Sequence, residues 1–239
     1  MPKFHTRWTV YRHGPLQQID RGLFCVDGEI HMPLGRFPRR MTIVVLHDGR
    51  TVVFSPVALH EPAMREIEKL GAPAFMIVPN GFHRLDSRIW KERYPETRVI
   101  CPPGAKSRVE EAVPVDATTD VLGDTDVELV IVPGMGEGEA MLIVRRDGRT
   151  TLVLNDVISN VRHPKGLGAN IMARLFGFGV HGPRMAREVK WLFVKDKKAL
   201  AARLRGWAAM PGLVRIIPSH GEIIDQPAAM LKRVADDLG

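Results

Sequence analysis

Hydrophobic and polar positions along the chain follow two different periods, which predict both strands and helices. Residues 41–47 form a run rich in β-branched side chains, and an Asp-Gly pair separates this run from the apolar residues 51–54. This pattern is typical of a β-hairpin. A similar pattern predicts a shorter hairpin over residues 22–31, with its turn at Asp27 and Gly28.

Helical periodicity appears between the predicted strands. In residues 62–70, the apolar side chains of Met64, Ile67 and Leu70 recur every third position behind a proline that suits a first helical turn. The wholly apolar residues 74–78 predict a strand that is buried on both faces. The same reasoning predicts further strands over 98–100, 127–132, 140–145, 150–154 and 213–217, and helices over 85–94, 105–112, 171–176, 196–209 and 227–238.

Strand-rich segments occur in both halves of the chain, and helical segments follow each of them. This order favours two sheets packed face to face with helices outside, in one α/β domain that spans residues 1–239. A single doubly wound sheet is the alternative, but the chain has two Asp-Gly hairpins and no GxGxxG pattern after a strand. With 45% hydrophobic and 26% charged residues, the composition excludes disordered, collagen-like and disulfide-scaffold chains.

The charge and the cysteine content bear on the binding partners of the protein and on the cellular compartment that we expect for it. The chain has 34 Lys and Arg against 27 Asp and Glu, a formal net charge of +7, and many basic residues lie between 184 and 205. Nucleic-acid binding is therefore one hypothesis, although a solvated basic surface explains the same excess. Two cysteines without a CxxC pair exclude a cysteine-based metal knuckle and suit a reducing compartment. Because no segment is typical of a signal sequence or a membrane span, we expect a cytoplasmic protein with no membrane partner.

Polar clusters follow three of the apolar strands, at the strand ends where α/β folds place their sites. The clusters contain Asn80, His83 and Asp86 after 74–78, Asp156 after 150–154, and His220 after 213–217. Histidine and aspartate are ligands that zinc, iron and manganese accept. Each residue also has a structural interpretation, such as a helix cap for Asp86 or a loop histidine bonded to a carbonyl for His83. Their shared position after strands is what favours a functional site.

A long connection over residues 160–185 is rich in glycine, proline, histidine and asparagine, and we expect it to cross above the strand ends. Asn160 and His181 are candidate binding residues of a lid, because such residues concentrate on loops of this kind. A surface role for His181 is the structural alternative. The apolar side chains between Met172 and Phe178 are consistent with either a pocket or a homodimer face.

Several short motifs, taken in their order along the chain, resemble the metallo-β-lactamase superfamily. The motifs are Phe54-Ser55-Pro56-Val57, the loop from Pro79 to Leu85, the segment from Trp90 to Pro95, Leu154-Asn155-Asp156 and Pro218-Ser219-His220-Gly221. They are most similar to a bacterial family of unknown function at the edge of the superfamily, whose motifs read P-N-x-x-H-H-L, W-x-x-x-Y-P, L-T-D and A-H-G. The resemblance covers residues 22–221 and implies a four-layer αββα sandwich.

The same resemblance implies that several of the superfamily's metal ligands are missing. Where its first ligand loop reads HxHxDH, His83 takes the second histidine, while Gly81 and Leu85 replace the first histidine and the aspartate. Asp86 stands at the last histidine of that loop, and Met135 replaces a histidine of the middle motif. The ligands that remain for a single zinc, iron or manganese ion are His83, Asp86, Asp156 and His220.

Three hypotheses for the function follow. The first is a hydrolase of small esters, thioesters or lactones, in which Asp156 and His83 are catalytic and His83 is either a ligand or a proton shuttle. The second is a metal-free binding or scaffold protein on the same fold, which the losses at Gly81, Leu85 and Met135 favour. The third is a nucleic-acid-binding protein, for which the net charge of +7 is the main support.

Overall fold

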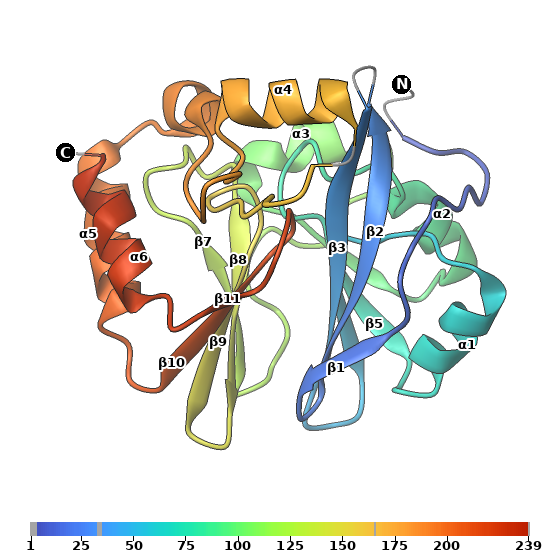
Figure 1. Cartoon of the computed structure of the whole chain (residues 1–239). Helices are drawn as coiled ribbons and strands as arrows, with labels where there is room; N and C mark the ends of the chain where they lie inside the picture. Colours follow the sequence, from blue (N-terminus) through green and yellow to red (C-terminus); the bar gives the residue numbers. More distant parts are fainter. Residues whose placement is uncertain (1–3, 33–34, 165, 239) are drawn as a thin grey trace.

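Two mixed β-sheets form the centre of the computed structural model, which describes residues 4–32, 35–164 and 166–238 (Figure 1). The first sheet has the strand order β1-β2-β3-β4-β5-β6 and the second β11-β10-β9-β8-β7. The strands of the first sheet are β1 (Gln17–Asp20), β2 (Leu23–Met32), β3 (Gly35–Val45), β4 (Thr51–Phe54), β5 (Pro73–Ile77) and β6 (Arg98–Ile100). Those of the second are β7 (Val127–Ile131), β8 (Ala140–Arg146), β9 (Arg149–Leu154), β10 (Leu213–Pro218) and β11 (Ile224–Asp225).

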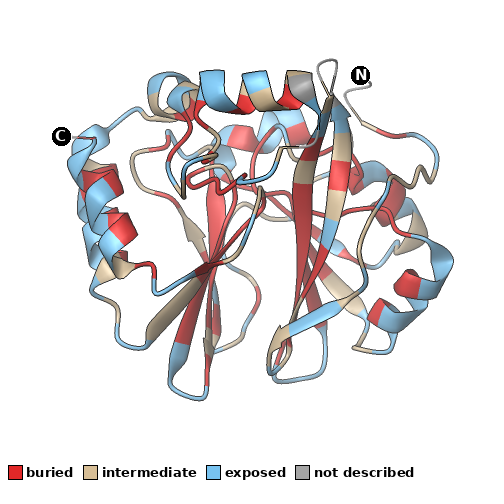
Figure 2. Ribbon diagram, in the orientation of Figure 1, coloured by how far each residue is buried: buried red, intermediate tan, exposed pale blue. Residues whose placement is uncertain are grey.

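Helices cover the outer face of each sheet, so the chain has four layers in the order αββα. On the first sheet lie α1 (Glu61–Glu68), α2 (Ser87–Arg93), the short turn η1 (Pro103–Ala105) and α3 (Lys106–Val109). On the second lie the π-helical turn η2 (Val189–Phe193), α5 (Lys197–Ala208) and α6 (Ala228–Asp236). A third apolar cluster fills the space between the sheets, and the ribbon coloured by burial shows long buried stretches in β3 and β8 (Figure 2).

Most of the predicted elements are confirmed. Strands β3 and β4 pair antiparallel through the turn at Asp48 and Gly49, where the positive φ of 84° is one that glycine adopts without strain. Strand β5 is an interior strand of its sheet and lies between the parallel neighbours β4 and β6, as its continuous apolar run predicts. Helix α5 begins after Asp196, whose carboxylate accepts a hydrogen bond from the Ala199 amide at 2.9 Å.

The predicted turn at Asp27 and Gly28 is wrong. Strand β2 runs through both residues and pairs with β3 along its whole length, from Leu23 to Met32. The Asp27 carboxylate accepts a hydrogen bond from Arg40 Nε on the paired strand at 2.7 Å. This cross-strand ion pair and the continuing ladder outweigh the local turn preference of the Asp-Gly pair. The predicted helix over 105–112 is also too long, since α3 ends at Val109.

One end of the sandwich collects the strand ends that carry the polar clusters. Strands β9 and β10 run parallel, so the segments after them leave the second sheet at the same edge. Helix α4 (Leu167–Phe176) crosses this end of the molecule above both sheets (Figure 1). In the described parts of the chain, no helix combines the length and the apolar character needed to cross a bilayer.

Candidate metal centre

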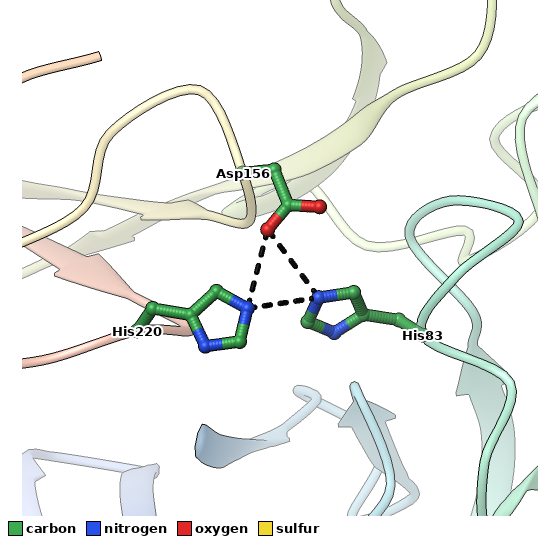
Figure 3. A group of neighbouring side chains, drawn as sticks. All are labelled: His83, Asp156 and His220. Carbon is green, nitrogen blue, oxygen red and sulfur yellow. Dashed lines mark hydrogen bonds and ion pairs between the residues drawn. The ribbon is translucent and has the colours of Figure 1, made fainter. Parts of the chain in front are cut away.

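Three side chains from both sheets converge at this end of the sandwich (Figure 3). His83 Nε2 lies 3.1 Å from His220 Nε2 and 3.4 Å from Asp156 Oδ1. His220 Nε2 lies 3.2 Å from the same Asp156 oxygen. In the described chain, these residues form the one group of three or more His, Cys, Asp or Glu whose ligand atoms are close enough to share a metal ion.

The backbone places each of the three residues just after an apolar strand. His83 lies in the loop after β5, Asp156 is two residues beyond the end of β9, and His220 is two residues beyond the end of β10. The amide of Ser219 donates to the Leu154 carbonyl at 2.9 Å, which continues the β9–β10 pairing into the site. The site therefore depends on the contact between the two sheets as well as on parallel strands within one of them.

The outer nitrogen of each imidazole is bound to a fixed group. His220 Nδ1 donates to the Pro38 carbonyl at 2.8 Å, so the neutral ring presents the lone pair of Nε2 to the cluster. His83 Nδ1 lies 2.9 Å from Ser55 Oγ. Ser55 has a left-handed backbone with φ of 56°, a conformation that costs a non-glycine residue about 1 kcal/mol. Anchored outer nitrogens of this kind are typical of histidines that bind metals.

Two further side chains hold Asp156 in place. Asn80 Nδ2 donates to Asp156 Oδ2 at 2.6 Å and to Glu139 Oε2 at 2.9 Å. The other Glu139 oxygen accepts the Asp156 amide at 2.8 Å. Asp156 Oδ2 is thus occupied by Asn80, whereas Oδ1 faces the two histidines.

Burial and mutual charge shift the pKa of every titratable group in the cluster. Burial tends to raise the pKa of Asp156, but the nearby His83 and His220 outweigh it and hold that pKa well below its usual value. Burial lowers the pKa of His83, and Asp156 offsets this only in part. Burial also acts to lower the pKa of His220, but its hydrogen bond to Asp156 and the carboxylate charge raise it overall. Burial and then repulsion by Asp156 raise the pKa of Glu139 well above the usual value for a glutamate.

The chemistry of these atoms fits a divalent metal ion. In its neutral form, His220 is an electron-pair donor through Nε2, as Asp156 is through Oδ1, and His83 Nε2 joins them whenever Ser55 accepts the Nδ1 proton. A proton on His83 Nε2 can be donated to either His220 Nε2 or Asp156 Oδ1, but not to both. One metal ion can accept electron pairs from all three atoms. The side chains of His83, Asp156 and His220 are 11%, 24% and 14% exposed, so the group is partly accessible from outside.

Asp86, the fourth expected ligand, lies outside this cluster. Its carboxylate is fully buried and accepts hydrogen bonds from Arg39 Nη2 at 2.6 Å and from the Ala58 amide at 3.1 Å. His5 Nδ1 lies 2.7 Å from the other oxygen. Arg39 and His5 therefore use the lone pairs that a metal would need, and Asp86 is not among the ligands that we propose below.

The remaining expected residues have different places. Asn80 is part of the site through its bonds to Asp156 and Glu139. Asn160 is buried, and its backbone amide donates to the backbone carbonyl of His220 at 3.0 Å. This hydrogen bond supports the loop that carries His220. His181 is exposed and does not belong to the cluster.

Two cavities are lined in part by members of this cluster. The larger, of about 310 Å³, is lined by Asn80, Glu139 and Asp156 at one end and by Phe82, Arg108 and Phe193 among others. A smaller cavity of about 50 Å³ is lined in part by Ser55, His83 and His220. The larger cavity joins a carboxylate of the cluster to an aromatic and basic wall, and its volume suits a small ligand.

Sequence reasoning missed three residues of the site. Ser55 belongs to a motif noted above, but its contact with His83 depends on the packing of β4 beside β5. Glu139 directly precedes β8, and its position before an apolar strand was the available signal. Arg108 gives no such signal, because it lies on a short helix in a stretch that contains other exposed charges.

Comparisons with known proteins address the fold. The metallo-β-lactamase DIM-1 superposes with a TM-score of 0.64 over 97% of this chain and 100% of its own, at 13% sequence identity. FIM-1 from Pseudomonas aeruginosa, in a mono-zinc form, gives a TM-score of 0.58 over 97% of this chain and 98% of its own, also at 13% identity. The chain has the metallo-β-lactamase fold. An enzyme from Pontibacter korlensis gives a TM-score of 0.62 over 93% of this chain and 98% of its own, at 13% identity.

The metallo-β-lactamase fold confirms the expected resemblance at the level of architecture. No protein-family model matches the chain, and no curated protein matches it either. The similarity to a bacterial family of unknown function therefore stays a prediction. The resemblance assigns missing ligands to three positions of this chain. Two of them carry the buried side chains of Leu85 and Met135. The third is Gly81, where a Cβ atom would lie 2.6 Å from Arg108 Cδ, so a larger residue would require the Arg108 side chain to move.

Proposed function

We propose that this chain is a metal-dependent hydrolase with a mononuclear centre, in which His83, Asp156 and His220 hold the ion. Three protein ligands and one open position are the usual arrangement of a catalytic zinc site. The mono-zinc form of FIM-1 indicates that a protein of this fold can hold a single zinc ion. Zinc is the metal we favour for a set of two imidazoles and one carboxylate, with iron and manganese as alternatives.

The observation that carries the proposal is the convergence of three electron-pair donors whose outer atoms are anchored. Ser55 and the Pro38 carbonyl orient the two imidazoles, and Asn80 orients the carboxylate. Protons on the imidazoles can hold this cluster together without a metal, but the anchored outer nitrogens and the cavity beside Asp156 favour a ligand set. We therefore favour the enzyme over the metal-free alternative.

A bound ion would supply Lewis acidity, which polarises a carbonyl group and activates water near neutral pH. The protein itself supplies the binding of the substrate and the placement of protons. Phe82 and Phe193 form an apolar wall of the larger cavity. Glu139, whose pKa is raised, holds a carboxyl group beside the same cavity that can carry a proton for a leaving group.

We propose small esters, thioesters or lactones as substrates. Each presents one polarisable carbonyl and one leaving oxygen or sulfur, and a cavity of about 310 Å³ holds only a small molecule of this type. The acyl part would lie against the aromatic wall, and the carbonyl group would be directed toward an ion held by His83, Asp156 and His220.

The test is hydrolysis of a panel of p-nitrophenyl esters, an acyl thioester and a simple lactone by protein stripped with a chelator and then reloaded with zinc. We expect turnover only in the reloaded protein, and its loss in Asp156→Asn. The matched control is Asp48→Asn, because Asp48 is an exposed aspartate in the turn between β3 and β4 that pairs with Arg50 and is not one of the three proposed ligands. Turnover that survives both chelation and Asp156→Asn would show that the centre is not the catalyst.

A further inference from the structure

The excess positive charge of the chain lies in one segment. Residues 157–198 contain nine Lys and Arg but only two Asp and Glu, so this segment carries an excess of seven. That value equals the formal net charge of the whole chain, and the remaining residues are balanced. The nine cations are Arg162, Lys165, Arg174, Arg184, Arg187, Lys190, Lys195, Lys197 and Lys198.

The same segment holds most of the large apolar side chains that the described structure leaves in solvent. Ile171, Leu175 and Phe176 on α4 are 59%, 62% and 38% exposed. Trp191 and Leu192 on η2 are 75% and 61% exposed. We call these five side chains the α4–η2 surface.

Helix α4 and the turn η2 adjoin each other. Arg187, two residues before η2, donates from Nη1 to the Leu175 carbonyl near the end of α4 at 3.0 Å. The other end of α4 packs on β3, where Ala169 lies against Gly35. The exposed outer face of α4 is visible along one end of the molecule (Figure 2). The apolar side chains therefore lie on a supported surface and not on a loose loop.

The cations of the segment 157–198 have few carboxylate partners. Among those in the described part of the chain, the structure pairs only Arg162 with a carboxylate, that of Glu222 at 3.9 Å. Lys190 and Lys195 donate to backbone carbonyls, of Asp237 and Leu192. The two acidic residues of the segment have other roles or surroundings. Asp196 caps α5, and Glu188 is half-buried.

A hollow beside Trp191 combines these features. It has a volume of about 320 Å³ and is lined by Arg184, Arg187, Lys190 and Trp191, with Asp237 as its one acidic residue. Several cations beside an exposed tryptophan suit the anionic headgroup layer of a bilayer, where tryptophan rings are enriched.

We propose that the α4–η2 surface docks the protein onto an anionic lipid bilayer as a peripheral contact. Exposed aliphatic and aromatic side chains would enter the headgroup boundary while the surrounding cations contact anionic lipids. A second copy of the chain fits this surface poorly, because two faces that each carry Arg174, Arg184, Arg187 and Lys190 repel each other. Nucleic acid accounts for the cations but not for the aliphatic Ile171, Leu175 and Leu192. The expectation of no membrane partner rested on the lack of spanning and signal segments, which a peripheral contact does not need.

The first test is co-sedimentation of the full chain with vesicles of phosphatidylcholine alone and with vesicles that contain about 30% phosphatidylserine. We expect about tenfold or more stronger binding to the anionic vesicles. Trp191 gives a second readout, because it is 75% exposed, whereas Trp90 and Trp207 are 1% exposed and Trp8 is partly buried against the helix-covered core of the first sheet. The fluorescence of Trp191 should shift to the blue on binding and be quenched by lipids brominated in the acyl chains.

Two double variants test the two parts of the surface. Leu175→Ala with Trp191→Ala removes apolar contact, and Arg174→Glu with Arg184→Glu reverses two charges. We expect each pair to weaken binding about tenfold or more while circular dichroism and the melting temperature stay near those of wild type. The matched control is Arg65→Glu with Lys69→Glu, which changes the net charge equally at exposed positions around α1, away from α4 (Figure 1).

Three outcomes would overturn the proposal. One is the absence of binding to anionic vesicles by folded wild-type protein. Another is binding that the apolar double variant leaves unchanged and that a single-stranded oligonucleotide matches, which would assign a general polyanion surface. The third is equal weakening by the α1 control. Because Asp156→Ala is expected to bind vesicles like wild type, a failure of docking and a failure of the proposed hydrolase are distinguishable.

Discussion

Two buried polar groups lie side by side in the sequence but differ in how their atoms are satisfied. His83 and Asp86 are three residues apart in the loop that follows β5. Asp86 belongs to a closed group, in which Arg39, His5 and the Ala58 amide occupy its two oxygens. His83 belongs to an open group, in which two imidazole nitrogens and the Asp156 carboxylate face one another beside a cavity.

The difference shows that residue type alone does not make a ligand. A carboxylate that already accepts charged and backbone donors is an internal ion pair, which contributes to folding if all its partners remain. Asp156 Oδ1 faces two imidazole nitrogens that can exchange their protons for a metal ion, so this carboxylate is available as a ligand. We therefore expect changes in the closed group to alter stability and changes in the open group to alter metal binding. The predictions below test this division, from the largest expected effect to the smallest.

Asp86→Ala should give the largest loss of stability. The change leaves the Arg39 guanidinium, 7% exposed, without its carboxylate, and breaking a buried ion pair in this way costs about 3–5 kcal/mol. Urea unfolding followed by circular dichroism measures the loss. If Asp86→Ala unfolded like wild type but no longer bound zinc, Asp86 would belong with the metal ligands and not with a stabilising ion pair.

Zinc should stabilise wild-type protein and have no effect on His220→Ala. An ion present at 100 times its dissociation constant adds about 2.7 kcal/mol to the free energy of unfolding, or about 5–10 °C in melting temperature for a chain of this size. Thermal melting of chelator-treated protein with and without added zinc measures the shift. An equal shift in His220→Ala would place the bound zinc elsewhere.

Ser55→Ala should weaken zinc binding without removing it. Loss of an outer partner of a ligand histidine typically lowers metal affinity about 10–100-fold. Competition with a chromophoric chelator measures the affinity. Ser219→Ala is the matched control, because the Ser219 hydroxyl is buried beside His220 but has no hydrogen-bond partner within the described structure. Equal effects of the two variants would show that Ser55 does not act through His83.

Acid should destabilise the protein through Asp86 with a modest slope. Burial tends to raise the pKa of Asp86, but the hydrogen bond from His5 and the charge of Arg39 hold it below its usual value. A depressed pKa in the folded state adds stability above the unfolded value of about 3.9, and this stability is lost as the pH falls through the folded value. One such group contributes at most about 1.4 kcal/mol per pH unit. Urea unfolding between pH 5 and pH 3 should show a smaller slope for Asp86→Asn than for wild type, and equal slopes would contradict this assignment.

Much of the fold follows from local patterns in the sequence. Continuous apolar runs predict β5, β9 and β10, and the polar residues just beyond them include all three members of the open group. The prediction succeeded because strand ends collect at one end of a sandwich of this type. This prediction concerns only the end of the fold at which the residues lie, and not which of their atoms are in contact.

The remainder depends on partners far along the chain. The residues near Asp86 in the sequence do not indicate which groups bind its carboxylate. Arg39 is 47 positions away and His5 is 81 positions away. His83 and Asp86 carry the same local signal, and only the packing of β3 and the N-terminal segment separates their roles. The misplaced turn at Asp27 has the same cause, since Arg40 on the neighbouring strand decides its conformation.

Elemental analysis of untagged protein tests the central claim most directly. Wild type, Asp156→Ala and Asp86→Ala would be purified in parallel, equilibrated with zinc and freed of unbound ions. The open group predicts about one metal ion per chain in wild type, almost none in Asp156→Ala, and about one per folded chain in Asp86→Ala. Metal-free wild type, or metal that stays in Asp156→Ala, would contradict a centre built from His83, Asp156 and His220.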